Sequence, residues 1–179
     1  GDDIIVGDIG AQNGTVGTMG SDIIRGGAGN DVLYGDTITT DGAVITSYGD
    51  DTLEGDEGDD LLIGDTESVI PAGVTRGADT FVFSIQQLFG ADTIRDYRNT
   101  DGDAVRFTGV TDANANGTIE LADLTALVTI TFEDDGGQVR ARLVRQSDAV
   151  LLGTIRFDNI AFTGQTSFDQ LDVTVQAAP

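Results

Sequence analysis

An eight-residue sequence occurs three times in the first 65 residues of this 179-residue chain. Each copy joins a glycine, two acidic or amide residues, a short apolar run and a closing Gly-Asp: Gly1-Asp-Asp-Ile-Ile-Val-Gly-Asp8, Gly29-Asn-Asp-Val-Leu-Tyr-Gly-Asp36 and Gly58-Asp-Asp-Leu-Leu-Ile-Gly-Asp65. The copies begin 28 and then 29 residues apart. One such unit cannot bury its apolar face alone, so units repeated at a fixed period stack on one another. The first half of the chain is therefore predicted to be a solenoid.

The composition of the chain restricts its chemistry to oxygen ligands. It has 31 acidic and 9 basic residues, a formal net charge of -22, and 26 of the acidic residues are Asp. Cys, His, Trp and Lys are absent, which excludes thiol, imidazole and Schiff-base chemistry and the usual ligands of zinc and copper. Phosphate binding needs basic patches, so no nucleic acid partner is expected. No stretch approaches the roughly 18 apolar residues of a membrane-spanning helix, so no membrane insertion is expected.

A nonapeptide lies within the longer repeat. Gly26-Gly-Ala-Gly-Asn-Asp-Val-Leu-Tyr34 fits the pattern Gly-Gly-x-Gly-x-Asp followed by a short apolar strand, and residues 17–25 and 55–63 are decayed copies. This pattern resembles the repeats-in-toxin (RTX) family of calcium-binding β-rolls. The resemblance implies a parallel β-roll that binds several Ca²⁺ ions, in a protein that a Gram-negative bacterium exports through a type I secretion apparatus.

The inward apolar positions alternate between short and long steps. The steps are 19, 9, 20, 9 and 19 residues, and the positions are Ile5, Ile24, Leu33, Leu53, Leu62 and Phe81. Since successive strands of a β-roll lie in opposite sheets, this alternation places tight turns at one edge. Enlarged loops at residues 9–19, 37–48 and 66–76 then lie at the other edge. A competing interpretation makes each insert contribute a third strand, such as Ala43–Thr46, and gives a three-sided coil.

We therefore expect an all-β fold in two regions. Residues 1–85 form a parallel β-roll, a β-solenoid of about three coils, and residues 86–179 form a β-rich cap with one short helix. A solenoid needs a cap because its last coil would expose an apolar face and unpaired strand edges. Residues 91–97 and 101–109 are similar to the closing segment that follows the repeats in RTX proteins. Alternating residues predict strands at 128–132, 139–144 and 149–157, with a turn at 133–137.

Turn aspartates are the candidate calcium ligands. Carboxylates from the sixth position of each nonapeptide and carbonyl oxygens of the glycine-rich turns can supply the roughly six oxygens, at about 2.3–2.6 Å, that Ca²⁺ takes. At the tight edge the candidates are Asp3, Asp31, Asp60 and Asp92, with the carbonyl groups of Gly26, Ala28, Gly55 and Glu57. At the other edge they are Asp22, Asp51, Asp79, Asp8, Asp36 and Asp65, and the closing segment adds Asp96, Asp101 and Asp103. The alternative is that all of these are solvated turn aspartates that bind no metal.

A second calcium motif lies in the C-terminal region. Residues 112–123 have the spacing of an EF-hand loop around Gly117. The oxygen ligands are Asp112, Asn114, Asn116, the carbonyl of Thr118, Glu120 and Asp123. The loop resembles the dockerin variant because its last position is Asp rather than Glu. An exit helix from Leu121 is expected, but no entering helix, and no cohesin partner is inferred. The alternative is an Asn-rich surface turn that only caps the helix.

The sequence as a whole predicts a secreted, non-catalytic calcium-binding module, the C-terminal part of a larger extracellular or cell-surface protein. The module is expected to fold on binding Ca²⁺ after type I secretion, and Leu171–Val175 loosely resembles the end of such a secretion signal. The adjacent acids Asp134 and Asp135 are expected to belong to a turn rather than to a glycosidase pair. An alternative function is adhesion, in which the long loops bind a surface polymer or a protein and calcium only rigidifies them. Any enzymatic activity is expected in a region upstream of this chain.

Overall fold

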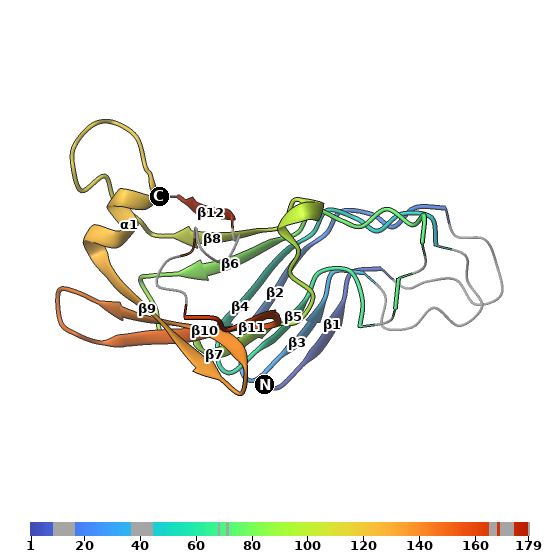
Figure 1. Cartoon of the computed structure of the whole chain (residues 1–179), viewed down its shortest axis with the longest axis horizontal. Coiled ribbons are helices and arrows are strands. Elements are labelled where there is room, and N and C mark those ends of the chain that lie inside the picture. Colours follow the sequence, from blue (N-terminus) through green and yellow to red (C-terminus); the bar gives the residue numbers. More distant parts are fainter. Residues whose placement is uncertain are drawn as a thin grey trace.

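The chain folds into two β-sheets that face each other (Figure 1). The computed structural model describes residues 1–8, 17–36, 45–67, 69–70, 72–164, 168 and 174–178. One sheet has seven strands in the order β1-β3-β5-β7-β11-β10-β9, and the other has five in the order β12-β8-β6-β4-β2. The strands are β1 (Ile4–Val6), β2 (Ile23–Ala28), β3 (Val32–Tyr34), β4 (Thr52–Glu57), β5 (Leu61–Ile63), β6 (Thr80–Ser84), β7 (Gly90–Ile94), β8 (Ala104–Thr108), β9 (Val128–Asp135), β10 (Gln138–Arg145), β11 (Leu151–Ala161) and β12 (Thr174–Ala177).

Two short helices accompany these strands in the described part of the chain. They are the 3₁₀ helix η1 (Asn99–Asp101) and the α-helix α1 (Leu121–Leu127). Among the residues just given as described, no helix has the length and apolar character needed to cross a membrane. The prediction of a mostly β fold with one α-helix is confirmed.

The strands from β1 to β8 alternate between the two sheets. The odd-numbered strands β1 to β7 pair in parallel in one sheet, and the even-numbered strands β2 to β8 pair in parallel in the other. We call each consecutive pair, one strand from each sheet, a layer: β1/β2, β3/β4, β5/β6 and β7/β8. The register aligns the predicted inward residues in two columns, Ile5-Leu33-Leu62 and Ile24-Leu53-Phe81. These columns continue into Ile94 and Val105, and every member except the half-buried Ile5 is buried. The predicted parallel stacking is confirmed, and the number of coils stays a prediction.

The two edges of the stack differ, as the spacing predicted. Residues 29–31 and 58–60 join strands of successive sheets at the tight edge. Residues 7–22, 35–51 and 64–79 connect the strands at the opposite edge, which we call the long-loop edge. Figure 1 shows the described parts of these long connections at one end of the molecule and α1 at the other.

The described parts of the long connections pack against one another. Thr18, Ser47 and Thr75 form parallel bridges. A small core of Met19, Ile45 and Tyr48, with Ile70 and Val74 against it, lies beside these bridges. The three-sided alternative placed a third strand in each insert, for instance at 43–46. Ile45 and Thr46 are not in a strand, and the parallel contact between the described parts of the inserts is the single bridged position at Thr18, Ser47 and Thr75. Residues 43 and 44 lie outside the described residues, as do residues 9–16 and 37–42 of the predicted loops.

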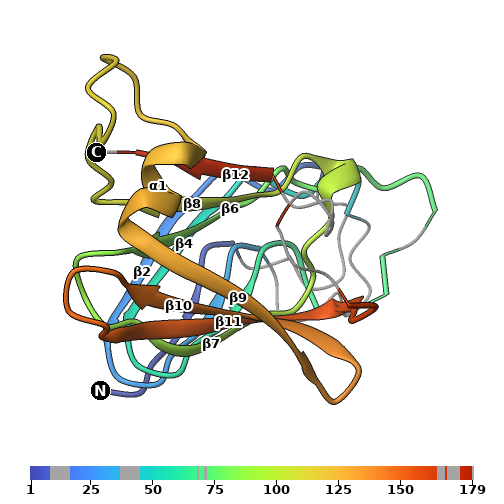
Figure 2. The same ribbon diagram turned by 60° about the vertical axis from the view of Figure 1, so that its left-hand side comes forward.

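The seven-stranded sheet is mixed, and its antiparallel strands come from the C-terminal region, outside the residues 1–85 predicted to form the parallel roll. β11 is parallel to β7, whereas β10 is antiparallel to both β11 and β9. β12 is parallel to β8 in the other sheet, and Figure 2 shows α1 beside this region. Strands on both sides of residue 85 belong to the same two sheets. The predicted domain boundary at that residue and the role of the C-terminal region as a cap stay predictions.

The turn predicted at 133–137 is shorter in the structure. β9 continues to Asp135, which pairs with Gln138, so Gly136 and Gly137 alone make the turn. Their φ angles of 65° and 91° are left-handed, a conformation that glycine adopts without steric cost. Two such residues in succession form the tight connection that suits a twisted hairpin. The acidic residues before the glycines therefore belong to the strand.

Candidate metal centres

Carboxylates at the tight edge connect successive layers through one of their two oxygens. The backbone N–H of Asp3 donates to Oδ1 of Asp31 at 2.7 Å. The N–H of Asp31 donates to Oδ1 of Asp60 at 2.8 Å, and the N–H of Asp60 donates to Oδ1 of Asp92 at 2.9 Å. The structure therefore aligns all four predicted tight-edge aspartates in one column. Hydrogen bonds from backbone N–H groups to a carboxylate are charge-assisted and stronger than neutral ones.

The long-loop edge has a second column of the same design. Asp22 donates its N–H to Oδ1 of Asp51 at 2.8 Å, and Asp51 donates to Oδ1 of Asp79 at 2.9 Å. Asp79 donates in turn to Oδ1 of Asp103 at 3.0 Å. The sequence had assigned Asp103 to a separate closing segment, but it continues this column.

Four of these carboxylates have their other oxygen buried without a hydrogen bond from the described residues. Within the described part of the chain this holds for Oδ2 of Asp22, Asp31, Asp51 and Asp60. A buried carboxylate oxygen that has lost water and gained no donor costs free energy. Such an oxygen is also the hard ligand that Ca²⁺ prefers. These positions are therefore suited to a cation.

Carbonyl oxygens lie next to the free carboxylate oxygens. Oδ2 of Asp31 and the carbonyl oxygen of Gly55, which belongs to the next layer, both approach Gly26 from the same side. Oδ2 of Asp51 and the carbonyl oxygen of Gly64 approach Gly35 in the same way. Carboxylate and carbonyl oxygens from successive layers thus converge, which is the ligand type that calcium sites use. The residues present fit calcium ions bound between layers.

Gly26 and Gly55 are needed for space. Neither has a positive φ, whereas Gly27 and Gly29 have φ angles of 93° and 139°. A Cβ atom at Gly26 would lie 2.5 Å from Oδ2 of Asp31 and 2.9 Å from the carbonyl oxygen of Gly55. Left-handed backbone angles, which glycine adopts freely, are therefore found at Gly27 and Gly29, whereas Gly26 and Gly55 are needed for space.

We expect Gly55→Ala to destabilise the folded chain by about 1–3 kcal/mol, the usual cost of overpacking. The added methyl group would collide with Oδ2 of Asp60. Urea unfolding in calcium measures the effect. Gly17→Ala is the matched control, because nothing lies within 4 Å of a Cβ atom at Gly17. An equal loss of stability in both variants would contradict this interpretation of the glycines.

A third set of carboxylates closes the long connections. Gly20, Gly49 and Gly77 donate their N–H groups to Asp8, Asp36 and Asp65, respectively. Asp96 accepts the N–H groups of Gly64 and Asp65, both at 2.9 Å. The predicted long-edge aspartates therefore form two rows. Each long connection starts at a member of the first row and ends at a member of the second; the rows are Asp8, Asp36 and Asp65, and Asp22, Asp51 and Asp79.

Burial raises the pKa of many of these carboxyl groups. It raises the pKa of Asp79 to about 10, of Asp92 to about 9 and of Asp36 to about 8. The pKa values of Asp51 and Asp103 rise to about 7 for the same first cause. Neighbouring carboxylates add to each rise, and hydrogen bonds from backbone N–H groups oppose it. Charged carboxylates are thus disfavoured in the fold unless a cation compensates them.

The sequence interpretation missed two further polar columns. Asn30 donates its N–H to Oδ1 of Asp2, Asp59 donates to Oδ1 of Asn30, and Ala91 donates to Oδ1 of Asp59. At the long-loop edge, Asp50 donates to Ser21, and Ala78 donates to Asp50. The signal in the sequence was a short polar residue directly before the predicted ligand Asp in successive copies. Both columns end at an alanine, which offers no side-chain acceptor.

Two of the predicted carbonyl ligands also take part in hydrogen bonds between layers. The carbonyl oxygen of Ala28 accepts a hydrogen bond from the amino group of Gly1, and that of Glu57 accepts one from the N–H of Gly29. A carbonyl oxygen has two lone pairs, so each retains capacity for a cation. Within the described segments, no group of three or more Asp or Glu side chains is arranged to hold a metal ion.

The EF-hand-like loop is closed by its own side chains. Asp112 accepts the N–H groups of Asn116 and Gly117 at 3.1 and 2.7 Å, and the φ of Gly117 is 87°. The amide groups of Asn114 and Asn116 both donate to Oε1 of Glu120. These contacts gather most of the predicted ligands around one small loop. β8 precedes the loop, so the predicted lack of an entering helix is confirmed.

Asp123 has a capping role besides its predicted role as a ligand. Its carboxylate accepts the N–H groups of Ala113 and Glu120, both at 3.0 Å, and Glu120 and Asp123 form a capping box at the start of α1. α1 ends at Leu127, and Val128 begins β9. The buried Asp123 therefore joins the first residues of the loop to the helix.

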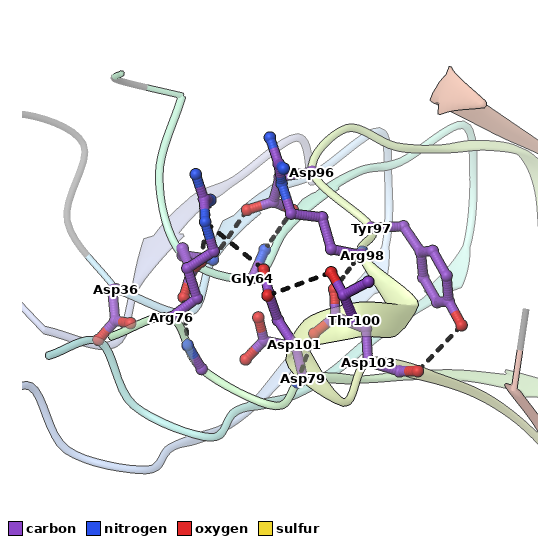
Figure 3. Close-up of polar contacts among 12 residues, drawn as sticks. Asp36, Gly64, Arg76, Asp79, Asp96, Tyr97, Arg98, Thr100, Asp101 and Asp103 are labelled. Atoms are coloured by element: carbon purple, nitrogen blue, oxygen red, sulfur yellow. Dashed lines mark hydrogen bonds and ion pairs between the residues drawn. The ribbon is translucent and has the colours of Figure 1, made fainter. Parts of the chain in front are cut away.

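The remaining predicted ligand, Asp101, lies beside an arginine. Figure 3 shows Arg76, of the third long connection, beside Asp101 of η1, with Asp79 and Asp96 nearby. Nε of Arg76 is 3.5 Å from Oδ2 of Asp101. Asp101 therefore faces a positive charge supplied by the protein.

Comparison with known families finds one match. Residues 16–37 and 43–67 match the model of the RTX calcium-binding nonapeptide repeat, which contains four copies. The matched residues include both tight turns, 29–31 and 58–60, and described parts of all three long connections. A search of curated proteins gives no match to this chain.

Proposed function

We propose that this chain, whose N-terminal region contains RTX calcium-binding repeats, is a non-catalytic module that folds by binding several Ca²⁺ ions and acts outside the cell. One observation carries the proposal: buried carboxylate oxygens without a hydrogen bond recur in register at both edges of the stack, at Asp22, Asp31, Asp51 and Asp60. The repetition supports a common ligand for them rather than four separate packing defects.

Calcium couples to folding through charge. Without a cation, the buried carboxylates of successive layers repel one another, and the net charge of -22 opposes compaction. The glycine-rich turns also lose much conformational entropy when they order. A bound Ca²⁺ ion supplies the positive charge, so its binding free energy becomes folding free energy. Asp31 and Asp60 hold the ions at the tight edge, and Asp51, Asp79, Asp36 and Asp65 hold them at the long-loop edge.

This coupling suits type I secretion from a Gram-negative bacterium. Calcium is scarce inside the cell and abundant outside, so the chain stays unfolded while the secretion apparatus threads it and folds after release. The C-terminal region then acts as the cap, since β11 and β12 pair with β7 and β8 and cover their edges. Residues 171–175 contribute to the secretion signal.

Titration calorimetry of the whole chain with calcium tests the proposed function. We expect saturation at several ions per chain, with the negative heat-capacity change that accompanies burial of apolar surface. Magnesium at the same concentration is the control, because it keeps its waters and demands a tighter octahedral site. An absence of saturable calcium binding would refute the proposal.

The EF-hand-like loop is proposed to hold one further ion. Asp112→Ala is expected to lower the number of calcium ions bound per chain by one, because Asp112 occupies the first ligand position and shapes the loop. Native mass spectrometry counts the ions. Asp148→Ala removes an exposed carboxylate that pairs with Arg145 and is the control. If the count stays unchanged in both variants, the loop is a surface turn that caps α1.

Adhesion is a second candidate function. The observation that favours it is the separate small core of Met19, Ile45 and Tyr48, which orders the long-loop edge beyond what the carboxylate columns require. A glycan-binding screen in calcium should compare the intact chain with a variant shortened in residues 37–44. Loss of binding at an unchanged calcium count would support adhesion, and equal binding by both chains would contradict a role of this loop.

A further inference from the structure

One position of the long-loop edge has a different kind of side chain in each of the first three layers. Met19, Tyr48 and Arg76 are equivalent, because each follows one of the bridged residues Thr18, Ser47 and Thr75. Each also precedes the glycine that donates to Asp8, Asp36 or Asp65. Met19 and Tyr48 are buried in the small core of this edge. The third layer thus places a charged side chain where the first two layers have an apolar or aromatic one.

The guanidinium group of Arg76 connects two successive parts of the stack. Its Nη1 is 3.6 Å from Oδ2 of Asp65, and its Nε is 3.5 Å from Oδ2 of Asp101. Asp65 closes the third long connection, and Asp101 lies in η1, which precedes the last strand of the roll. Oδ2 of Asp101 is buried without a hydrogen bond among the described residues. Arg76 therefore places a cation between two carboxylates that come from successive layers.

The equivalent places in the first two layers have no such charge. Met19 and Tyr48 are uncharged and buried, and Oδ1 of Asp36 is buried without a hydrogen bond among the described residues. The protein itself thus supplies a cation between the third and fourth layers, whereas these positions of the earlier layers supply none.

We infer that Arg76 supplies the positive charge between the third and fourth layers of the long-loop edge, where its guanidinium group lies between Asp65 and Asp101. Calcium supplies this charge between the earlier layers, so no Ca²⁺ ion binds between the third and the fourth. The inference rests on the proposed calcium-binding function. A guanidinium group stays charged at every relevant pH. It also repels a second cation placed between the same carboxylates. The sequence thereby determines between which layers the stack depends on calcium. The last two layers are held together at the long-loop edge without a calcium ion.

The test counts calcium ions in variants of Arg76. Arg76→Met introduces the residue that the first layer has at this position, and we expect it to bind one more calcium ion per chain than the parent. It should also need a higher calcium concentration to fold. Arg76→Lys keeps a positive charge and should retain the parent count. Arg25→Met is the control, because Arg25 is 70% exposed and pairs with Glu54.

The outcomes separate this inference from the proposed function. If the parent chain binds calcium and Arg76→Met binds the same number of ions, the inference is overturned. It is also overturned if Arg76→Met stays unfolded in millimolar calcium, because calcium then cannot replace the guanidinium group. If the parent chain itself binds no calcium, the proposed function fails. Native mass spectrometry supplies the count, and circular dichroism supplies the folding curve.

Discussion

Replacing Asp31 and Asp60 together with alanine is expected to lower the free energy of unfolding in calcium by about 3–6 kcal/mol. Each carboxylate accepts a backbone N–H from the preceding layer, and a hydrogen bond to a charged group contributes roughly 1.5–3 kcal/mol. The double variant also removes two proposed calcium ligands. Since small domains are stable by only about 5–15 kcal/mol, the variant should fold only at a much higher calcium concentration.

The matched control for this variant is Asp134→Ala with Asp135→Ala. Asp134 accepts the N–H of Gly137, and Asp135 pairs with Arg140 and Arg156, whose side chains are 34% and 36% exposed. Ion pairs near the surface contribute little, about 0–1 kcal/mol each. Calcium titrations followed by circular dichroism compare the two double variants. Equal effects would show that the tight-edge column has no special role in calcium-dependent folding.

Acidification is expected to fold the metal-free chain. The pKa values of Asp79, Asp92 and Asp36 in the fold are raised to about 10, 9 and 8, against about 3.9 in an unfolded chain. A raised pKa of an acid means that the fold binds the proton more tightly than the unfolded chain does. The stability from these groups is therefore fully present below about pH 4 and is lost as the pH rises through 8 to 10.

The pH dependence can be measured on chain freed of calcium by dialysis. We expect more β-structure and a smaller hydrodynamic radius at pH 4 than at pH 8. With saturating calcium the difference near neutral pH should shrink, because the metal replaces the protons, and calcium binding at pH 7 should release protons. A metal-free chain that is as folded at pH 8 as at pH 4 would contradict the role assigned to the buried carboxylates.

Much of the stack could be predicted from the sequence because its period repeats a complete local unit. The inward columns and the two unlike edges follow from the spacing of residues such as Leu33, Leu53 and Leu62. Alternation of one inward residue with outward neighbours fixes the register of a strand, since a shift by one residue would reverse its faces. A turn of fixed length then fixes the distance to the next strand.

Other features depend on contacts between residues that lie far apart in the sequence, which no local sequence pattern can predict. β11 pairs with β7 in parallel although nearly sixty residues separate them, and the alternating pattern of residues 149–157 gives only the strand. The place of Asp103 in the long-edge column depends on where η1 ends, and η1 has no counterpart in the repeats. Arg76 was likewise unremarkable in the sequence, because its partner Asp101 lies in the following layer.

The most direct test of calcium-coupled folding is to remove calcium from the folded chain and return it, and to measure circular dichroism and the radius of gyration at pH 7.5. For 179 residues, a compact chain has a radius of gyration of about 16 Å and an unfolded one of about 45 Å. We predict loss of the β-signal and expansion toward the larger value after removal, with full recovery when calcium returns. A chain that keeps its β-signal and its compact radius without calcium would contradict the account.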